Sequence, residues 1–182
     1  MENGILEYFK LLLDLGIALR VVFDGIKEKA QQKVAEQLQD IISDLKKILD
    51  EAERILILIQ TADEKVKEYG EPKFINILQG NFRSQFRKII DIAEKIENSK
   101  VFNKIDKELR DKLKILVRFK GYSIRIALQI LSYEELKIEN NQIFIIEEKN
   151  KKKLPAFPAV DKQKEILSQI KNYSQSLVSH IK

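Results

Sequence analysis

The sequence predicts an all-α fold, a single domain over residues 1–182 in which four to five long helices pack around one heptad-patterned helix. Composition supports this class, because 34% of the residues are charged, only 8% are aromatic, and there are six glycines and three prolines. Spacing supports it more strongly, since ten apolar residues follow one another in alternating steps of four and three, as in a coiled-coil seam. The seam residues are Val34, Leu38, Ile41, Leu45, Ile48, Ala52, Ile55, Ile59, Ala62 and Val66.

Residues 4–26 predict a first helix that is apolar around most of its circumference and therefore buried by more than one neighbour. The alternatives for the same segment are a signal peptide or a membrane span. Four charged residues interrupt it and no basic stretch precedes it, which favours a core helix of a soluble, cytoplasmic protein. The interrupting residues are Glu7, Lys10, Asp14 and Arg20. Gly25 is the expected break before the next element.

The heptad pattern predicts one long helix over residues 28–68, ending at Tyr69-Gly70. Residues 72–133 then predict a basic helical pair that starts at Pro72, because proline suits a first helical turn. Within this pair we expect a short turn over 73–78 closed by Gly80 and an amphipathic helix over 81–98. A further long helix should start at Asn103 or Asp106 and continue to residue 133.

Residues 135–147 change period and predict a small β-hairpin, in which apolar residues alternate on both sides of Asn140-Asn141. Two asparagines tolerate the positive φ of a tight turn. The alternative interpretation is a helix tail followed by a loop. Residues 149–158 are basic, contain proline and predict a loop without regular structure. Asp161 is expected to cap a last amphipathic helix over 161–182.

Few residues in the sequence suit catalysis, so we expect no enzyme, no cofactor and no metal site. Cysteine is absent, and the one histidine, His180, lies two residues from the end. Its neighbours lack the Arg-x(4–6)-His spacing of one class of helical ribonucleases and the Glu-x-x-His pairs of di-iron bundles. Neither a Gly-rich phosphate loop nor a nucleophile elbow occurs.

Charge is distributed unevenly along the chain, with a net −4 over residues 1–70, +7 over 81–125 and +2 over the rest. A basic centre of this kind favours a polyanionic partner, and a solvated basic face is the alternative. Residues 112–132 contain no acidic residue. On one continuous helix, Lys114, Arg118 and Arg125 would lie within about 40° of one another, as a stripe between two apolar flanks.

The predicted nucleic-acid-binding residues combine this stripe with basic residues of the preceding helix. We expect them to contact phosphates without reading bases, so that binding is strongly salt-sensitive. Gly121 lies within the stripe. Its missing side chain would allow close approach of a ligand; the alternatives are close packing against another helix or a kink. Tyr122 could stack on a base or belong to the core. The predicted binding residues are Arg83, Arg87, Lys88, Lys114, Arg118 and Arg125.

Residues 81–125 resemble the small helical subunit of type III CRISPR effector complexes. The resemblance lies in the stretch Ser84-Gln85-Phe86-Arg87-Lys88-Ile89 and in a following helix with Leu113, Lys114, Arg118, Tyr122 and Arg125. It implies a compact, non-catalytic helical bundle that stacks in several copies along guide and target RNA. Arg87 and Lys88 would then correspond to the basic pair after Ser-Gln, and Arg118 and Arg125 to basic residues of the next helix.

Three functions remain open from the sequence. The first is a non-catalytic subunit that binds an RNA or RNA–DNA backbone within a larger ribonucleoprotein assembly, such as a CRISPR effector in antiviral defence. The second is a protein-protein interaction or self-association module in which the heptad helix docks a partner without nucleic acid. The third is a membrane-active bundle led by the first helix, which ranks last because its charges make insertion costly.

Overall fold

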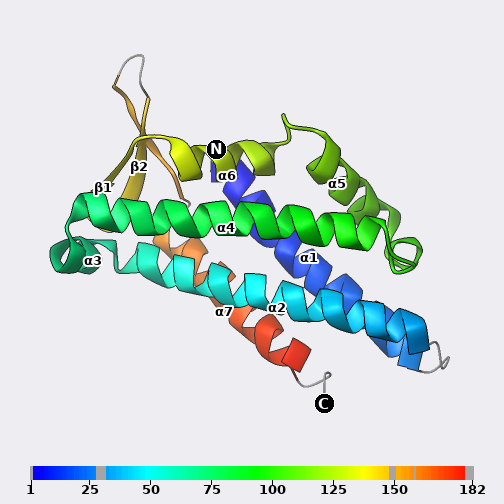
Figure 1. Ribbon diagram of the computed structural model, residues 1–182. Helices are drawn as coiled ribbons and strands as arrows, with labels where there is room; N and C mark the ends of the chain where they lie inside the picture. The colour runs from blue at the N-terminus through cyan, green and yellow to red at the C-terminus, as the bar shows by residue number, and fades with distance from the viewer. Residues whose placement is uncertain (1, 28–31, 148–150, 158, 179–182) are drawn as a thin grey trace.

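The computed structural model describes residues 2–27, 32–147, 151–157 and 159–178. These ranges form a helical bundle with a small antiparallel sheet at one end (Figure 1), which confirms the predicted fold class. The helices are α1 (Glu2–Lys27), α2 (Gln32–Gln60), α3 (Ala62–Tyr69), α4 (Glu71–Glu97), the 3-10 helix η1 (Phe102–Lys104), α5 (Lys107–Arg118), α6 (Ser123–Tyr133) and α7 (Val160–Val178).

The heptad seam lies in the core of the bundle. Nine of its ten residues are buried and the tenth, Val66, is partly buried. The covering surfaces come from this same chain, because α2 packs against α1, α4 and α7 (Figure 1). The seam is therefore not available to a partner, and a protein-protein role would need another surface.

The predicted 28–68 helix is not continuous, because it breaks at Thr61 between α2 and α3. The Thr61 hydroxyl donates to the carbonyl of Ile57 at 2.9 Å, a back-bond that competes with regular helix geometry. The side chain of Asn141, at the tip of the hairpin, accepts from the backbone N–H of Asp63 at 2.8 Å. A residue 78 positions away thus satisfies one of the free amides at the start of α3.

The predicted helix end at Gly80 is wrong, because α4 runs through it, whereas α1, predicted over residues 4–26, ends at Lys27, two residues after Gly25. In α4, the residues Phe74, Leu78 and Phe82 are spaced by four and are at most 1% exposed. Burial of this face outweighs the cost of about 1 kcal/mol for glycine in a helix. The expected helix end at Gly70 is confirmed, since Gly70 has φ 81° between α3 and α4.

The long helix predicted to reach residue 133 is two helices. Asp106 caps α5 as expected, because its carboxylate accepts from the Leu109 N–H at 2.9 Å. Helix α5 ends at Arg118 and α6 starts at Ser123, with residues 119–122 as a connector. Lys114 and Arg118 therefore do not share a helix with Arg125, and the predicted continuous stripe is wrong.

The hairpin prediction is confirmed and the loop prediction is corrected. Strands β1 (Leu136–Glu139) and β2 (Gln142–Ile146) pair antiparallel around Asn140 and Asn141, which have φ of 51° and 55°. Residues 153–155, expected to be irregular, form β3 (Lys153–Pro155), which pairs with β2. Proline is compatible with this position because β3 is an edge strand.

The last helix, α7, packs along α1 and α2, with Ile166 and Ile170 buried. It begins at Val160, so Asp161 lies in its first turn and is not the cap that was expected. His180 and the predicted helix end at residue 182 lie outside the described residues. Helix α1 contacts α2, α6 and α7, which confirms burial by several neighbours. Across the described ranges, none of the helices combines the length and apolar character required to span a membrane.

Candidate functional site

The six predicted binding residues lie on three helices, α4, α5 and α6. Helices α5 and α6 both pack against α4. Arg83, Arg87 and Lys88 belong to α4, Lys114 and Arg118 to α5, and Arg125 to α6. The tertiary structure therefore brings the two basic segments together, although many of their charged groups are engaged within the protein.

Arg125 stabilises the C-terminal end of α5. One of its guanidinium nitrogens, Nη1, donates to the carbonyls of Leu116 at 3.0 Å and Val117 at 2.8 Å. These carbonyls belong to the last turn of a helix, where intrahelical partners are missing and a cation is favourable. The same guanidinium lies 5.5 Å from the centroid of the Phe86 ring. Arg125 thus connects α4, α5 and α6, which is a structural role.

Changing Arg125 to alanine is expected to lower the free energy of unfolding by about 1.5 kcal/mol, because charge-assisted hydrogen bonds to two carbonyls are lost. Arg87→Ala is the matched control, since Arg87 is exposed and a surface change of this kind costs less than about 0.5 kcal/mol. Urea unfolding followed by circular dichroism measures both. Equal stability of the two variants would show that Arg125 is not required to hold α5.

Three further basic residues have partners at the surface. Arg118 pairs with Glu97, although its side chain remains 68% exposed. Arg83 lies 5.7 Å from the ring centroid of Tyr133, and Lys114 lies 5.3 Å from that of Phe102. Contacts of this kind at exposed or partly exposed positions are weak, on the order of 1 kcal/mol. A ligand with stronger electrostatic attraction could therefore recruit these three cations.

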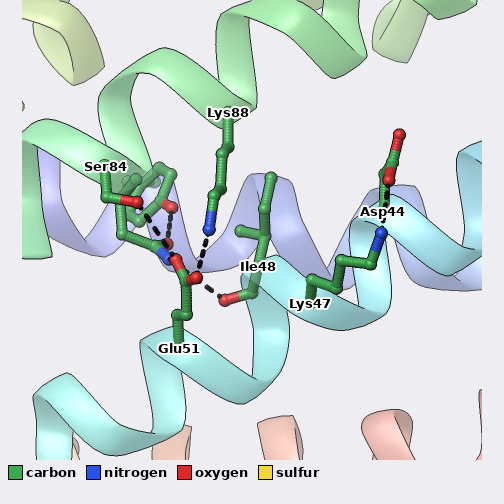
Figure 2. Close-up of polar contacts among 8 residues, drawn as sticks. Asp44, Lys47, Ile48, Glu51, Ser84 and Lys88 are labelled. Carbon is green, nitrogen blue, oxygen red and sulfur yellow. Dashed lines mark hydrogen bonds and ion pairs between the residues drawn. The ribbon is translucent and has the colours of Figure 1, made fainter.

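Lys88 lies at the partly exposed edge of a polar network between α1, α2 and α4. Figure 2 shows Ser84 and Lys88 of α4 directed toward Glu51 of α2, and Lys88 forms an ion pair with Glu51. Between them on α4, Gln85 is fully buried and donates to Glu51 at 3.0 Å. Gln85 in turn accepts a hydrogen bond from the hydroxyl of Tyr8. Burial, with a smaller contribution from Glu51, raises the pKa of Tyr8 well above its usual value, so Tyr8 stays a donor.

The orientation of this network bears on the CRISPR resemblance. Ser84, Gln85 and Lys88, which belong to the stretch that carries the resemblance, contact Glu51 at the interface between α2 and α4. Lys88 is thereby a structural cation. Arg87 is exposed and makes no ion pair or hydrogen bond with the rest of the described chain.

A second ion pair continues the contact between α2 and α4. Lys95 donates to Asp44, seven residues beyond Lys88 on α4 and seven before Glu51 on α2. The hydrogen bond from Lys95 is the main reason that the pKa of Asp44 lies below its usual value. Ion pairs between two helices, on either side of their apolar seam, also stabilise coiled coils. These charges therefore stabilise the bundle rather than form a site.

The connector between α5 and α6 contains the exposed groups that the sequence reasoning missed. Phe119 is 61% exposed, and Lys120 and Gly121 beside it are exposed. Gly121 lies in the connector rather than in a helical stripe, and its neighbour is the Phe119 ring, which a Cβ atom would approach to 3.0 Å. Tyr122 is partly buried and precedes the first residue of α6. The sequence pattern that could have identified these groups is an aromatic residue between two cations, Arg118-Phe119-Lys120.

A groove with a volume of about 690 Å³ lies between α1 and the start of α5. Its apolar lining includes Ile17 and Val21, which are 42% and 66% exposed. Charged residues also line it, and Lys112 bridges Asp14 at 3.8 Å and Glu108 at 2.7 Å. In the described part of the chain, no group of three or more His, Cys, Asp or Glu residues could hold a metal ion.

Comparisons with known proteins found no similarity: no family model, no curated protein and no solved structure matches this chain.

Proposed function

We propose that this chain is a non-catalytic helical protein that binds the backbone of RNA, or of an RNA–DNA duplex, on the basic surface formed by α4, α5 and the connector to α6. The observation that carries the proposal is the set of cations still exposed there after packing. Arg87 and Lys120 make no ion pair with any described residue, and the side chain of Arg118 remains 68% exposed. An unpaired, exposed cation can exchange its counterions for phosphates.

The role of the six predicted residues is unequal in this proposal. Arg87 and Arg118 contact phosphates directly, joined by Lys120, while Arg83 and Lys114 are recruited from their aromatic partners. Lys88 and Arg125 hold the helices in place. Assembly into a ribonucleoprotein like the type III CRISPR effectors is the finer form of the proposal, and it is supported by the resemblance of residues 81–125 alone.

The test is a fluorescence-anisotropy titration of nuclease-treated protein with a labelled 20-nucleotide RNA and a 20-base-pair duplex, between about 50 and 200 mM salt. We expect affinity to fall steeply with salt. The variant Arg87→Ala with Lys120→Ala should weaken binding and reduce the slope of log affinity against log salt by about 2, because each lost phosphate contact contributes about 1.

The matched control also removes two positive charges, but from the acidic part of the chain, residues 1–70. Lys33 and Lys67 are exposed on α2 and α3, and neither forms an ion pair with the described residues. Lys33→Ala with Lys67→Ala should leave the salt slope unchanged. Absence of binding at 50 mM salt, or an equal loss in both double variants, would refute a localised nucleic-acid surface.

A protein-protein interaction module is the second candidate, and the groove between α1 and α5 favours it. The exposed Ile17 and Val21 are apolar side chains that a partner could cover. The buried heptad seam cannot serve this purpose, so this function moves to α1. Sedimentation of the purified chain, together with pull-down after nuclease treatment, distinguishes it from the first candidate.

A further inference from the structure

Two aromatic side chains are more than half exposed on the α5–α6 side of the bundle. Phe119 is 61% exposed and Tyr133 is 66% exposed, and Tyr69, at 37%, is the next most exposed aromatic residue of the described chain. Leaving a phenyl ring in water forgoes a burial of about 1.5 to 3 kcal/mol, so a ring exposed this far without a packing role is a candidate contact. Because Phe119 carries no polar group, its interaction must use the ring itself.

The surroundings of Phe119 are basic. Arg118 and Lys120 flank it in sequence and both are exposed. Arg118 donates through Nη2 to Glu97, which leaves other N–H groups of the guanidinium for a ligand. Gly121 is so close to the ring that a Cβ atom there would lie 3.0 Å from Phe119 Cζ. The exposed ring is therefore preceded and followed in sequence by an exposed cation, and it lies against a residue without a side chain.

We propose that Phe119 stacks on an unpaired base of single-stranded RNA, while Arg118 and Lys120 contact the phosphates on either side of that base. This inference rests on the proposed function and narrows its ligand to single strands. Bases in a duplex already stack on one another, so an exposed ring gains little from a duplex. A single strand offers free base faces, and aromatic platforms beside cations are the usual means of binding it without sequence preference.

Tyr133 provides a second ring in the same setting, because the Arg83 guanidinium lies 5.7 Å from its centroid. Its position at the end of α6 places it ten residues after the start of that helix, about 15 Å along the axis. A single strand crossing from the connector to the end of α6 would meet both rings. Phe119 is the stronger test, because exposed cations both precede and follow it in the sequence.

The sequence contains no tryptophan, so Phe119→Trp creates a single fluorescent reporter at the proposed contact. Stacking on a base should quench this tryptophan when a 20-nucleotide RNA without self-complementarity is added, with a much smaller change for the matching blunt duplex. Ile57→Trp is the control reporter, since Ile57 is 40% exposed on α2 in the acidic half. It should not respond to either RNA.

Affinity measurements complete the test. Phe119→Ala should weaken single-strand binding about tenfold, because one stacked base is lost, and should change duplex binding less than about twofold. Ile115→Ala is the matched control: Ile115 is 43% exposed on α5, and its loss removes apolar surface without removing a ring. It should leave both affinities within about twofold.

The remaining outcomes would contradict either the proposed function or the stacking of Phe119. Binding of neither RNA would refute the proposed function itself. Equal, salt-sensitive binding of both RNAs, with no effect of Phe119→Ala, would leave the proposed function standing and refute the stacking. A blue shift of the Phe119→Trp variant on vesicles of phosphatidylglycerol and phosphatidylcholine, without a response to RNA, would replace the base with a lipid surface.

Discussion

Replacing Gln85 with alanine should lower the free energy of unfolding by about 3 kcal/mol, a large share of the stability of a small domain. Gln85 is fully buried on α4 and connects three helices through its amide. Its loss leaves the buried hydroxyl of Tyr8 without an acceptor and removes a donor from Glu51. A cavity in place of the amide adds to the cost.

A matched control comes from the neighbouring residue. The hydroxyl of Ser84 approaches the same carboxylate at 3.5 Å, which is long for a hydrogen bond, so Ser84→Ala should cost less than about 0.5 kcal/mol. Urea unfolding of Tyr8→Phe, Gln85→Ala and the double variant gives a coupling energy. We expect the double variant to cost less than the sum of the two, because Tyr8→Phe removes the orphaned hydroxyl. Strict additivity would contradict the network.

Gly4→Ala should destabilise the protein by about 2 kcal/mol, although alanine is the better helix former. A Cβ atom at Gly4 would lie 2.7 Å from the backbone oxygen of Ser123 and 2.9 Å from the Cβ of Ala127. Helices α1 and α6 approach too closely there for a methyl group, and one of the atoms in the way belongs to the backbone. Overpacking of this kind costs about 1 to 3 kcal/mol, more than the helix propensity returns.

The same helix supplies the control. Among the described residues, no atom outside the helix lies within 4 Å of a Cβ atom built at Gly16 or at Gly25. Alanine at either position should raise the free energy of unfolding by about 0.5 to 1 kcal/mol, as expected for an unhindered helical site. Thermal unfolding of the three variants compares them directly. A stabilised Gly4→Ala variant would mean that α1 and α6 are not in close contact at this point.

The site was only partly predictable from sequence. Charge counting located the basic segments, and α4, α5 and α6 do place them along one another. It could not distinguish Arg87, which has no ion pair within the described ranges, from Lys88, which pairs with Glu51. The two are adjacent in sequence and differ by about 100° around the helix, so the position of α2 alone decides which of them is structural.

Sequence by itself determined the features that depend on neighbouring residues. The heptad spacing predicted a helix with one buried seam, Asp106 predicted a helix start, and Asn140-Asn141 predicted the hairpin turn, because periodicity, capping and turn chemistry are local. Only the tertiary structure decided where the long helices break. Asn141 stabilises the start of α3, Arg125 stabilises the end of α5, and the buried face of α4 carries the helix through Gly80. In the first two cases the decisive partner is distant in sequence or on another helix, and in the third the burial depends on packing that no local pattern encodes.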